Sequence, residues 1–287
     1  MFGSHLSIAG GMHNAVAEAT RLSFDTVQVF TKNQQQWAVK PLESDAIDAW
    51  RTACKSAGFT QTVSHDSYLI NLATQDPALR AKSVALFEEE LRRCEALGIP
   101  YLVTHPGAHL CERDDEAHET AGLVRVAQAL TELLAKFPKG TTTVCVESTA
   151  GQGTCLGHKL EHLGLLIKLV KPSKRIGVCL DTAHLFAAGY DFRGRKYSAF
   201  LKQLDETVGP DGVKVWHLND SKKPLGSRVD RHHHIGHGEI GLDGFRPIVR
   251  DKRWADVPKI LETAKDKDER GRDWDVVNLE TLRGLMK

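Results

Sequence analysis

Short runs of apolar and β-branched residues alternate with longer amphipathic segments along almost the whole chain. The first run, at residues 3–8, precedes a helical pattern at 13–22, and the next, at 25–30, precedes one at 43–58. Such alternation is typical of parallel βαβ units. About eight strands are expected, at residues 3–8, 25–30, 61–65, 101–105, 142–147, 176–181, 213–217 and 257–262. In 287 residues they predict one α/β domain, a single (β/α)₈ TIM barrel over residues 1–287.

The net charge of the chain and its cysteines indicate how an anionic partner could be bound and in which compartment the protein is expected. The formal net charge is only +1, so an anionic partner must be held by a local patch or by metal ions. None of the six cysteines forms a CxxC pair, and Cys145 and Cys179 lie in apolar strand-like runs that suit core residues. No signal region or membrane-length apolar stretch is present. We therefore expect a cytoplasmic protein without membrane association, and nothing demands more than a monomer.

Polar side chains with metal-ligand chemistry stand at the ends of the expected strands. These residues are His65, His105, Glu147, Asp181, His217 and Glu262, and His5 lies in the first strand. In a (β/α)₈ barrel the carboxyl ends of the strands gather at one mouth, where active sites are built. Several buried carboxylates and imidazoles would be costly there unless they bind cations. The pattern predicts two or three ions of Zn²⁺, Mn²⁺ or Fe²⁺, with one carboxylate bridging two of them.

The segment VDRHHHIGHGEIG, residues 229–241, follows the seventh expected strand and lies over the same mouth. Asp230 and His232 are separated by one residue, so in an extended segment both point to the same side. Together with His184, one turn after Asp181, they are expected to hold a separate ion. His233 is expected to face away, whereas the roles of His234 and His237 stay open.

Several long motifs resemble those of the endonuclease IV family, the metal-dependent apurinic/apyrimidinic endonucleases. The motifs are FTKNQQQW, HDSYLINL, HPGAH, VESTAGQG, GVCLDTAHLFAAGYD, HLNDSKKPLGSRVDRHHHIGHGEIG and ILET, and they extend to about Thr263. The resemblance implies three metal ions, usually zinc. The implied ligands are His65, His105 and the bridging Glu147 for the first ion, Asp181, His217 and Glu262 with Glu147 for the second, and His184, Asp230 and His232 for the third.

The resemblance also implies an activity in DNA repair. The family cleaves the phosphodiester bond 5′ to abasic sites in duplex DNA with metal-activated water, and it trims blocked 3′ ends. Glu147 and Glu262 are then the catalytic carboxylates, with Glu262 a ligand first and an orienting group for water second. Gln35, Tyr68 and Leu69 correspond to residues that fill the gap left by the flipped abasic nucleotide.

Three residues depart from the family pattern. Gln35 stands where an arginine can enter the base stack, Ser148 follows Glu147 where asparagine is common, and His237 stands where an acidic residue is common. Gln35 therefore brings no charge to the base stack.

Two other classes of protein share some of these features. A metal-dependent sugar isomerase or epimerase of the xylose-isomerase-like kind would also place His, Asp and Glu at the strand ends of a (β/α)₈ barrel. It generally needs fewer ligands than the present set with His184, Asp230 and His232. A non-catalytic, metal-dependent DNA-binding protein is the other alternative, and a single turnover would exclude it.

Overall fold

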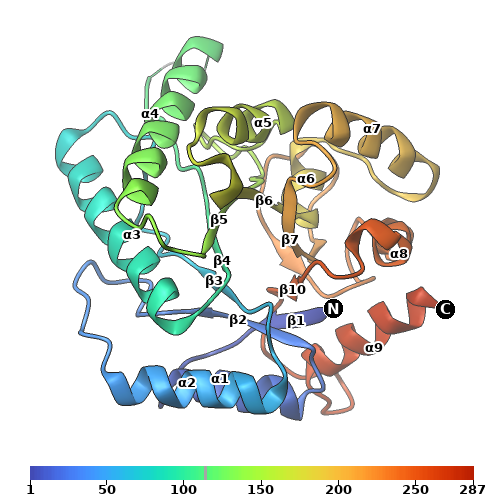
Figure 1. Ribbon diagram of the computed structural model, residues 1–287. Coiled ribbons are helices and arrows are strands. Elements are labelled where there is room, and N and C mark those ends of the chain that lie inside the picture. The colour runs from blue at the N-terminus through green and yellow to red at the C-terminus, as the bar shows by residue number, and fades with distance from the viewer. Residues whose placement is uncertain (113–114) are drawn as a thin grey trace.

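A computed structural model describes residues 1–112 and 115–287, and in this part of the chain eight parallel strands close into a barrel (Figure 1). The strands are β1 (Phe2–His5), β2 (Thr26–Phe30), β3 (Val63–His65), β4 (Tyr101–Thr104), β5 (Thr143–Glu147), β6 (Ile176–Asp181), β7 (Val213–His217) and β10 (Lys259–Leu261). Their order around the barrel is β1-β10-β7-β6-β5-β4-β3-β2. The predicted (β/α)₈ barrel is confirmed, and strand ends differ from the expected ones by a few residues at most on the mouth side.

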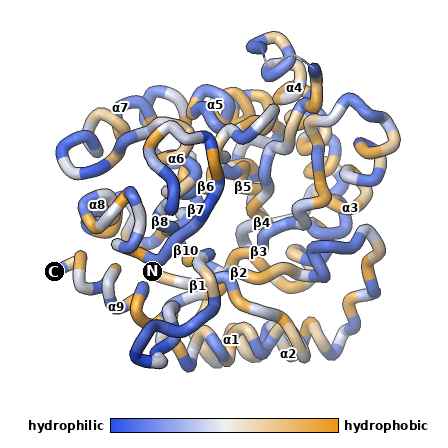
Figure 2. Tube along the Cα trace, turned by 180° about the vertical axis from the view of Figure 1, so that it is seen from behind, coloured by the Kyte–Doolittle hydropathy of each residue, from blue (hydrophilic) through white to orange (hydrophobic). Residues whose placement is uncertain are grey.

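Helices form the outer layer around the strands (Figure 1). They are α1 (Met12–Arg21), α2 (Ser44–Ala57), α3 (Pro77–Leu97), α4 (Glu116–Ala135), α5 (Leu160–Leu169), α7 (Tyr197–Thr207), α8 (Leu242–Arg250) and α9 (Trp274–Met286). Hydrophobic and hydrophilic residues are interspersed along helices such as α1 and α2 (Figure 2), as expected for helices that pack one face on a barrel. Gly58 and Gly98 end α2 and α3 in the left-handed conformation, which glycine adopts without strain.

The interior of the barrel below the mouth is apolar and closely packed. It is filled by fully buried side chains from six strands, namely Val63, Val103, Cys145, Cys179, Val215 and Ile260. Cys145 and Cys179 are thus core residues, in agreement with the expectation from sequence. This apolar layer separates the polar mouth from the opposite end of the barrel, so the charged residues above it have one route to solvent.

Two short elements at the mouth have no counterpart in the sequence prediction. A helix, α6 (Thr182–Ala188), follows β6 directly. A two-stranded antiparallel hairpin joins β8 (Asp220–Ser221) to β9 (His232–His233) within a segment that the sequence predicts as a plain loop. Among the described residues, no helix is long and apolar enough to cross a membrane.

Candidate metal centre

All nine side chains expected as ligands converge at the carboxyl end of the barrel. Asp181 and His217 close their strands, and His105 and Glu262 come one residue after theirs. Four overlapping groups in the described chain have ligand atoms mutually within 4.8 Å: His65, His105 and Glu147; Glu147, Cys179 and His217; Asp181, His184 and His232; and Glu147, Asp181, His217 and Glu262.

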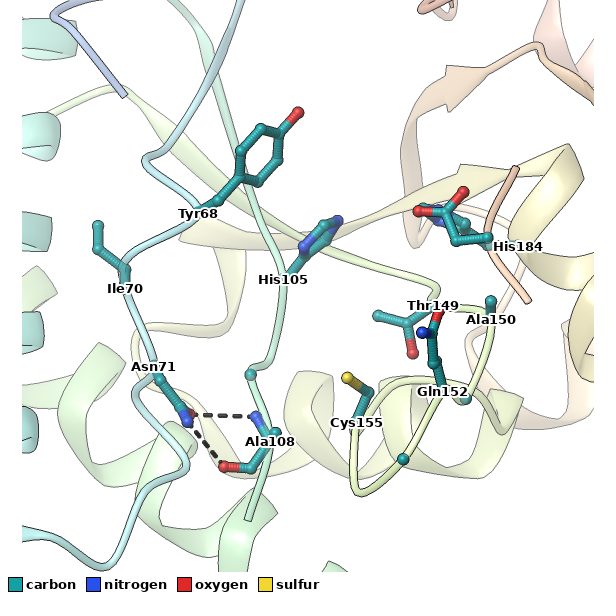
Figure 3. Close-up of a pocket in the computed structure, with 14 residues that line it drawn as sticks. Tyr68, Ile70, Asn71, His105, Ala108, Thr149, Ala150, Gln152, Cys155 and His184 are labelled. Atoms are coloured by element: carbon teal, nitrogen blue, oxygen red, sulfur yellow. Dashed lines mark hydrogen bonds and ion pairs between the residues drawn. The ribbon is translucent and has the colours of Figure 1, made fainter. Parts of the chain in front are cut away.

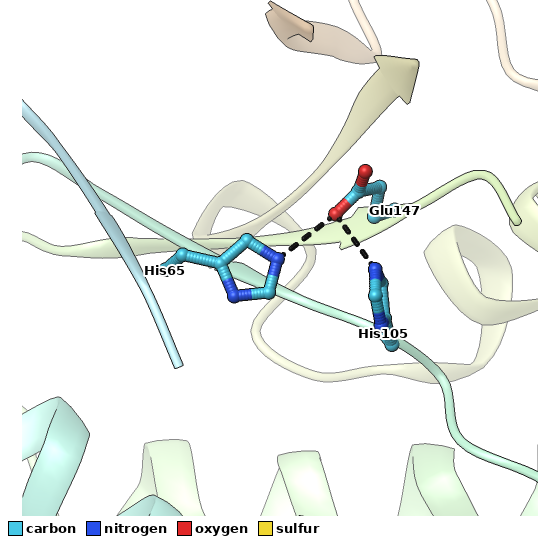
Figure 4. A group of neighbouring side chains, drawn as sticks. All are labelled: His65, His105 and Glu147. Carbon is cyan, nitrogen blue, oxygen red and sulfur yellow. Dashed lines mark hydrogen bonds and ion pairs between the residues drawn. The ribbon is translucent and has the colours of Figure 1, made fainter. Parts of the chain in front are cut away.

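In the first group one carboxylate oxygen faces two imidazoles (Figure 4). Glu147 Oε2 lies 3.1 Å from His65 Nε2 and 3.2 Å from His105 Nε2. The other ring nitrogen of His65, Nδ1, is 2.9 Å from the carbonyl oxygen of Asp66, which orients the ring with Nε2 toward Glu147. This arrangement leaves the Nε2 atoms of both rings directed at a common point.

The second group uses the other oxygen of the same carboxylate. Glu147 Oε1 lies 3.0 Å from His217 Nδ1, and this nitrogen is also 3.1 Å from Glu262 Oε2. Asp181 contributes an oxygen from the end of β6. Because its two oxygens face different groups, Glu147 has the geometry of a bridging ligand.

The third group connects α6 to the histidine-rich segment. Asp230 places Oδ2 at 3.1 Å from His184 Nε2 and Oδ1 at 3.2 Å from His232 Nε2. Asp230 and His232 therefore point to the same side, as the one-residue spacing predicts. Asp181 Oδ2 is 3.6 Å from His232 Nε2, so this group adjoins the second.

The side chains at the mouth are buried charges that compensate one another. Burial would raise the pKa of Glu147, but the imidazoles of His217 and His105 outweigh it and hold that pKa well below its usual range. Burial would likewise lower the pKa of His184, but Asp181, Asp230 and Glu147 raise it well above 6.5. The carboxylates thus favour the protonated, positively charged form of the neighbouring imidazoles. Bound metal cations can supply this positive charge in place of the protons.

The donor set fits divalent ions of the zinc type. Imidazole nitrogens and carboxylate oxygens are the ligands that Zn²⁺, Mn²⁺ and Fe²⁺ accept. The Nε2 atom of His232 is buried and makes no hydrogen bond within the described chain, although it lies near Asp230. A buried imidazole nitrogen that faces carboxylates without a hydrogen bond is suited to binding a cation.

Cys179 lies close to Glu147 and His217 but does not suit the role of a ligand. Its side chain is fully buried in the apolar layer with Val215 and Ile260, and burial raises the pKa of its thiol to about 12. Cys179 thus remains part of the apolar layer beneath the centre.

Three polar residues support the candidate ligands, and of these only Ser148 is singled out from the sequence. Asn219 donates to Asp181 Oδ2 at 2.6 Å and accepts from the Glu262 backbone at 2.8 Å. Ser148, one of the departures from the family pattern, accepts from the Asp181 backbone through Oγ at 2.9 Å. Gln28 contacts both His217 and Glu262. A glutamine inside the apolar run DTVQVF is the one signal in the sequence that could have indicated its role.

The remaining histidines of the 229–241 segment lie outside the metal groups. His234 stacks on Trp274 with 3.9 Å between ring centroids, and its Nε2 is 3.3 Å from Asp266. His237 is exposed and meets the edge of the same tryptophan. His233 is half-buried and accepts the His234 backbone N–H, so it is not simply solvated.

A buried carboxylate organises the same segment. Asp220 accepts backbone N–H groups from four residues at 2.8–3.0 Å, namely Ser221, Gly236, Gly238 and Ile240. This fixes the far end of the segment on the hairpin that carries His232.

The residues expected to contact DNA lie at the rim of the mouth. Tyr68 is 59% exposed, and its ring packs 5.4 Å from that of His65 and 6.0 Å from that of His105. Leu69 is half-buried and Gln35 is exposed. Ser67 Oγ donates to the Gln34 carbonyl at 2.5 Å, which ties the loop of Gln35 to the loop of Tyr68.

A pocket of about 480 Å³ opens beside the first and third groups (Figure 3). His105, His184 and Asp230 are among the residues that line it, and Tyr68 and Asn71 stand across from the loop that carries Gln152. Asn71 is fixed by hydrogen bonds to the backbone of Ala108, so this wall is preformed. The pocket leads from the surface to the metal groups.

The fold and the site together define a class of enzyme. Residues 16–282 match the family model described as "Xylose isomerase-like TIM barrel". A D-tagatose 3-epimerase-like protein shares the fold at 18% identity, with a TM-score of 0.72 and coverage of 99% of this chain and 96% of that one. At this level the class is a (β/α)₈ barrel enzyme with its site at the strand ends.

Closer relatives identify the family within this class. The chain is 48% identical to probable endonuclease 4 of Chloroflexus aurantiacus, covering 100% of this chain and 98% of the relative. It is 45% identical to probable endonuclease 4 of Geobacter sulfurreducens, covering 99% and 94%. The crystal structure of endonuclease IV from Thermus thermophilus matches with a TM-score of 0.83 at 36% identity, covering 99% and 98%. The chain belongs to the endonuclease IV family, which confirms the predicted family and nuclease class and leaves the sugar-isomerase alternative less supported.

Proposed function

We propose that this protein cleaves the phosphodiester bond on the 5′ side of abasic sites in duplex DNA, that it trims blocked 3′ ends, and that it uses about three zinc ions. The observation that supports the proposal is the convergence of nine imidazole and carboxylate side chains in three linked groups at one barrel mouth. A sugar isomerase would have no evident use for the third group. Mn²⁺ or Fe²⁺ is also compatible with some of these ligands.

Each group of residues has a distinct role in this proposal. His65, His105 and Glu147 would hold the first ion, Glu147 with Asp181, His217 and Glu262 the second, and His184, Asp230 and His232 the third. Bound ions would lower the pKa of water and neutralise the charge of the scissile phosphate. They would also explain how a chain with a net charge of +1 engages DNA at this mouth.

The two glutamates do more than supply charge. Glu147 keeps two groups at a fixed separation, because its oxygens face different imidazoles. Glu262 is nearly buried and has one oxygen against His217 and the other against the amide of Gln28. Its orientation is thereby fixed, and it is the carboxylate placed to orient an attacking water.

The rim residues would hold the distorted duplex. Tyr68 presents an exposed ring directly above His65 and His105, so a base stacked on it would leave the adjacent phosphate near the metal groups. Leu69 and Gln35 flank it on the two joined loops. The protein would act as a monomer, since one chain supplies all of these groups.

The deciding experiment uses an end-labelled duplex with a single abasic-site analogue. The purified protein is expected to cut it once, on the 5′ side of the analogue, and a chelator should abolish the cut until zinc is restored. An intact duplex of the same sequence is the control. Absence of cleavage by protein shown to contain metal would overturn the proposal.

A further inference from the structure

A buried glutamine on another strand of the barrel connects two of the proposed ligands. Gln28 lies on β2, is fully buried, and its side chain reaches across the mouth toward β7 and β10. Its Oε1 is 2.8 Å from His217 Nε2, and its Nε2 is 2.6 Å from Glu262 Oε1. These two ligands belong to the same proposed ion, so one amide contacts both.

The carboxylate of Glu262 fixes which way the amide faces. A carboxylate only accepts hydrogen bonds, so the NH₂ group of Gln28 must point toward Glu262. The same NH₂ group is 2.9 Å from His5 Nδ1 and can donate its second proton there. Gln28 Oε1 is therefore left toward His217 as an acceptor.

The acceptor in turn fixes the protonation of His217. An amide oxygen requires a donor, so His217 Nε2 carries a proton in this contact. In the neutral ring the lone pair then lies on Nδ1, which is the nitrogen that faces Glu147 and Glu262 at 3.0 and 3.1 Å. The hydrogen bond to the second ring nitrogen is the usual means by which proteins select the metal-binding nitrogen of histidine.

We propose that Gln28 is a positioning residue for the second ion, selecting the His217 tautomer that ligates through Nδ1 and aligning Glu262 with it. The assignment rests on the proposed metal-dependent function. It gives Gln28 no contact with DNA and no part in bond breaking. Loss of the Gln28 amide is expected to lower the affinity for the second ion only, because Gln28 contacts no residue that belongs solely to the first or the third group.

The first test measures zinc binding by chelator competition in the parent, in Gln28→Met and in Thr26→Val. Gln28→Met keeps the shape of the side chain and removes the amide. The affinity for one zinc ion should then fall by about 10–100-fold. Thr26→Val is the matched control, because Thr26 is buried on the same strand and its hydroxyl donates to the Gln61 carbonyl, away from the mouth. It should bind all ions as the parent does.

Two outcomes of this test overturn the assignment. If Gln28→Met retains every ion with parental affinity, Gln28 does not position the ligands, and the metal-dependent function stands unaffected. If the parent itself binds no ion, the metal centre is wrong and this assignment fails with it. Gln28→Glu keeps an acceptor for His217 but opposes Glu262 with like charge, and parental affinity in this variant would overturn the role toward Glu262.

A second test uses the parent protein and therefore does not depend on whether the variants fold. In the zinc-loaded parent, imidazole ¹⁵N NMR should show His217 protonated on Nε2 and unprotonated on Nδ1. A proton on Nδ1 would overturn the proposal.

Discussion

His184 Nε2 lies 3.1 Å from Asp230 Oδ2, which joins the helix after β6 to the histidine-rich segment after β7. The contact is between a buried imidazole and a carboxylate that also faces His232. The third group therefore takes its residues from a helix and a hairpin segment, in addition to the ends of barrel strands. The clearest tests of the metal centre therefore compare residues within and beside these groups.

Glu147→Gln should be the most damaging single change at the mouth. The amide removes the charge that two groups share, so ions of both the first and second groups should be lost or weakened, and cleavage should fall by on the order of 10²–10³-fold or more. Metal content and abasic-site cleavage measure the two effects.

Glu119→Gln is the matched control for this change. Glu119 is also buried, but its carboxylate contacts Lys159, His158 and His162 away from the mouth. Its variant should keep the parental number of ions. Equal metal loss in the two variants would mean that general destabilisation, and not ligation, is being measured.

His232→Ala and His233→Ala should differ sharply although the residues are neighbours. His232 faces Asp230 and Asp181, whereas His233 contacts His234 and His237 outside the metal groups. The first variant should lose about one ion and most activity, and the second should resemble the parent. Comparable losses in elemental analysis and cleavage would contradict the assignment of the third group.

Zinc binding near neutral pH should release protons. Burial would lower the pKa of His232, but Asp181 and Asp230 raise it to about 9, and His184 is raised for the same reason. Because these pKa values are raised, the rings hold protons below them, and zinc must displace those protons. The apparent affinity should therefore increase with pH up to about 9, where His232 loses its proton. Calorimetry in buffers of different ionisation enthalpy counts the protons, and a pH-independent affinity would exclude this competition.

Tyr68→Ala should weaken binding of abasic duplex more than Gln35→Ala does. The exposed ring offers a stacking surface, and base–aromatic stacking contributes about 1–3 kcal/mol. Gln35→Arg should tighten binding and steepen its salt dependence, because the added charge contacts phosphates. The affinity of each of the three variants for abasic duplex is measured over a series of salt concentrations. A metal assay first shows that each variant holds the parental number of ions. Parental affinity of Tyr68→Ala would assign Tyr68 to packing of the rim.

The barrel and the convergence of the candidate ligands could be predicted because their signals are local. Each ligand such as His65 or Asp181 stands at the end of a short apolar run, and barrel geometry alone brings those ends together. Asp230 and His232 were recognisable from their spacing. Asp181 also caps α6 by accepting the His184 backbone N–H. An aspartate after a strand commonly serves as a helix cap, and here the same side chain can serve both as the cap and as the proposed ligand.

Other features depend on contacts between distant segments and could not be predicted in this way. The role of Gln28 requires closure of the barrel, which leaves only β1 between β2 and β10 although these two strands are far apart in the sequence. The helix α6 is buried on nearly all sides, so it shows no amphipathic period. The hairpin of Asp220 and His233 is only two residues long on each side, below the length at which alternation is visible.

Six of the nine proposed ligands come from six neighbouring strands of the barrel or from the residue directly after them, and the other three lie on α6 and in the segment that contains β9. No single βα unit can assemble an ion site, so each ion would act as a clamp between segments remote in sequence. Local opening of any one of these strands would then cost part of the ion-binding free energy, and opening would be coupled among the six strands that carry ligands. Loss of metal would loosen the barrel cooperatively from its mouth, so metal supply would set the lifetime of the folded enzyme as well as its activity.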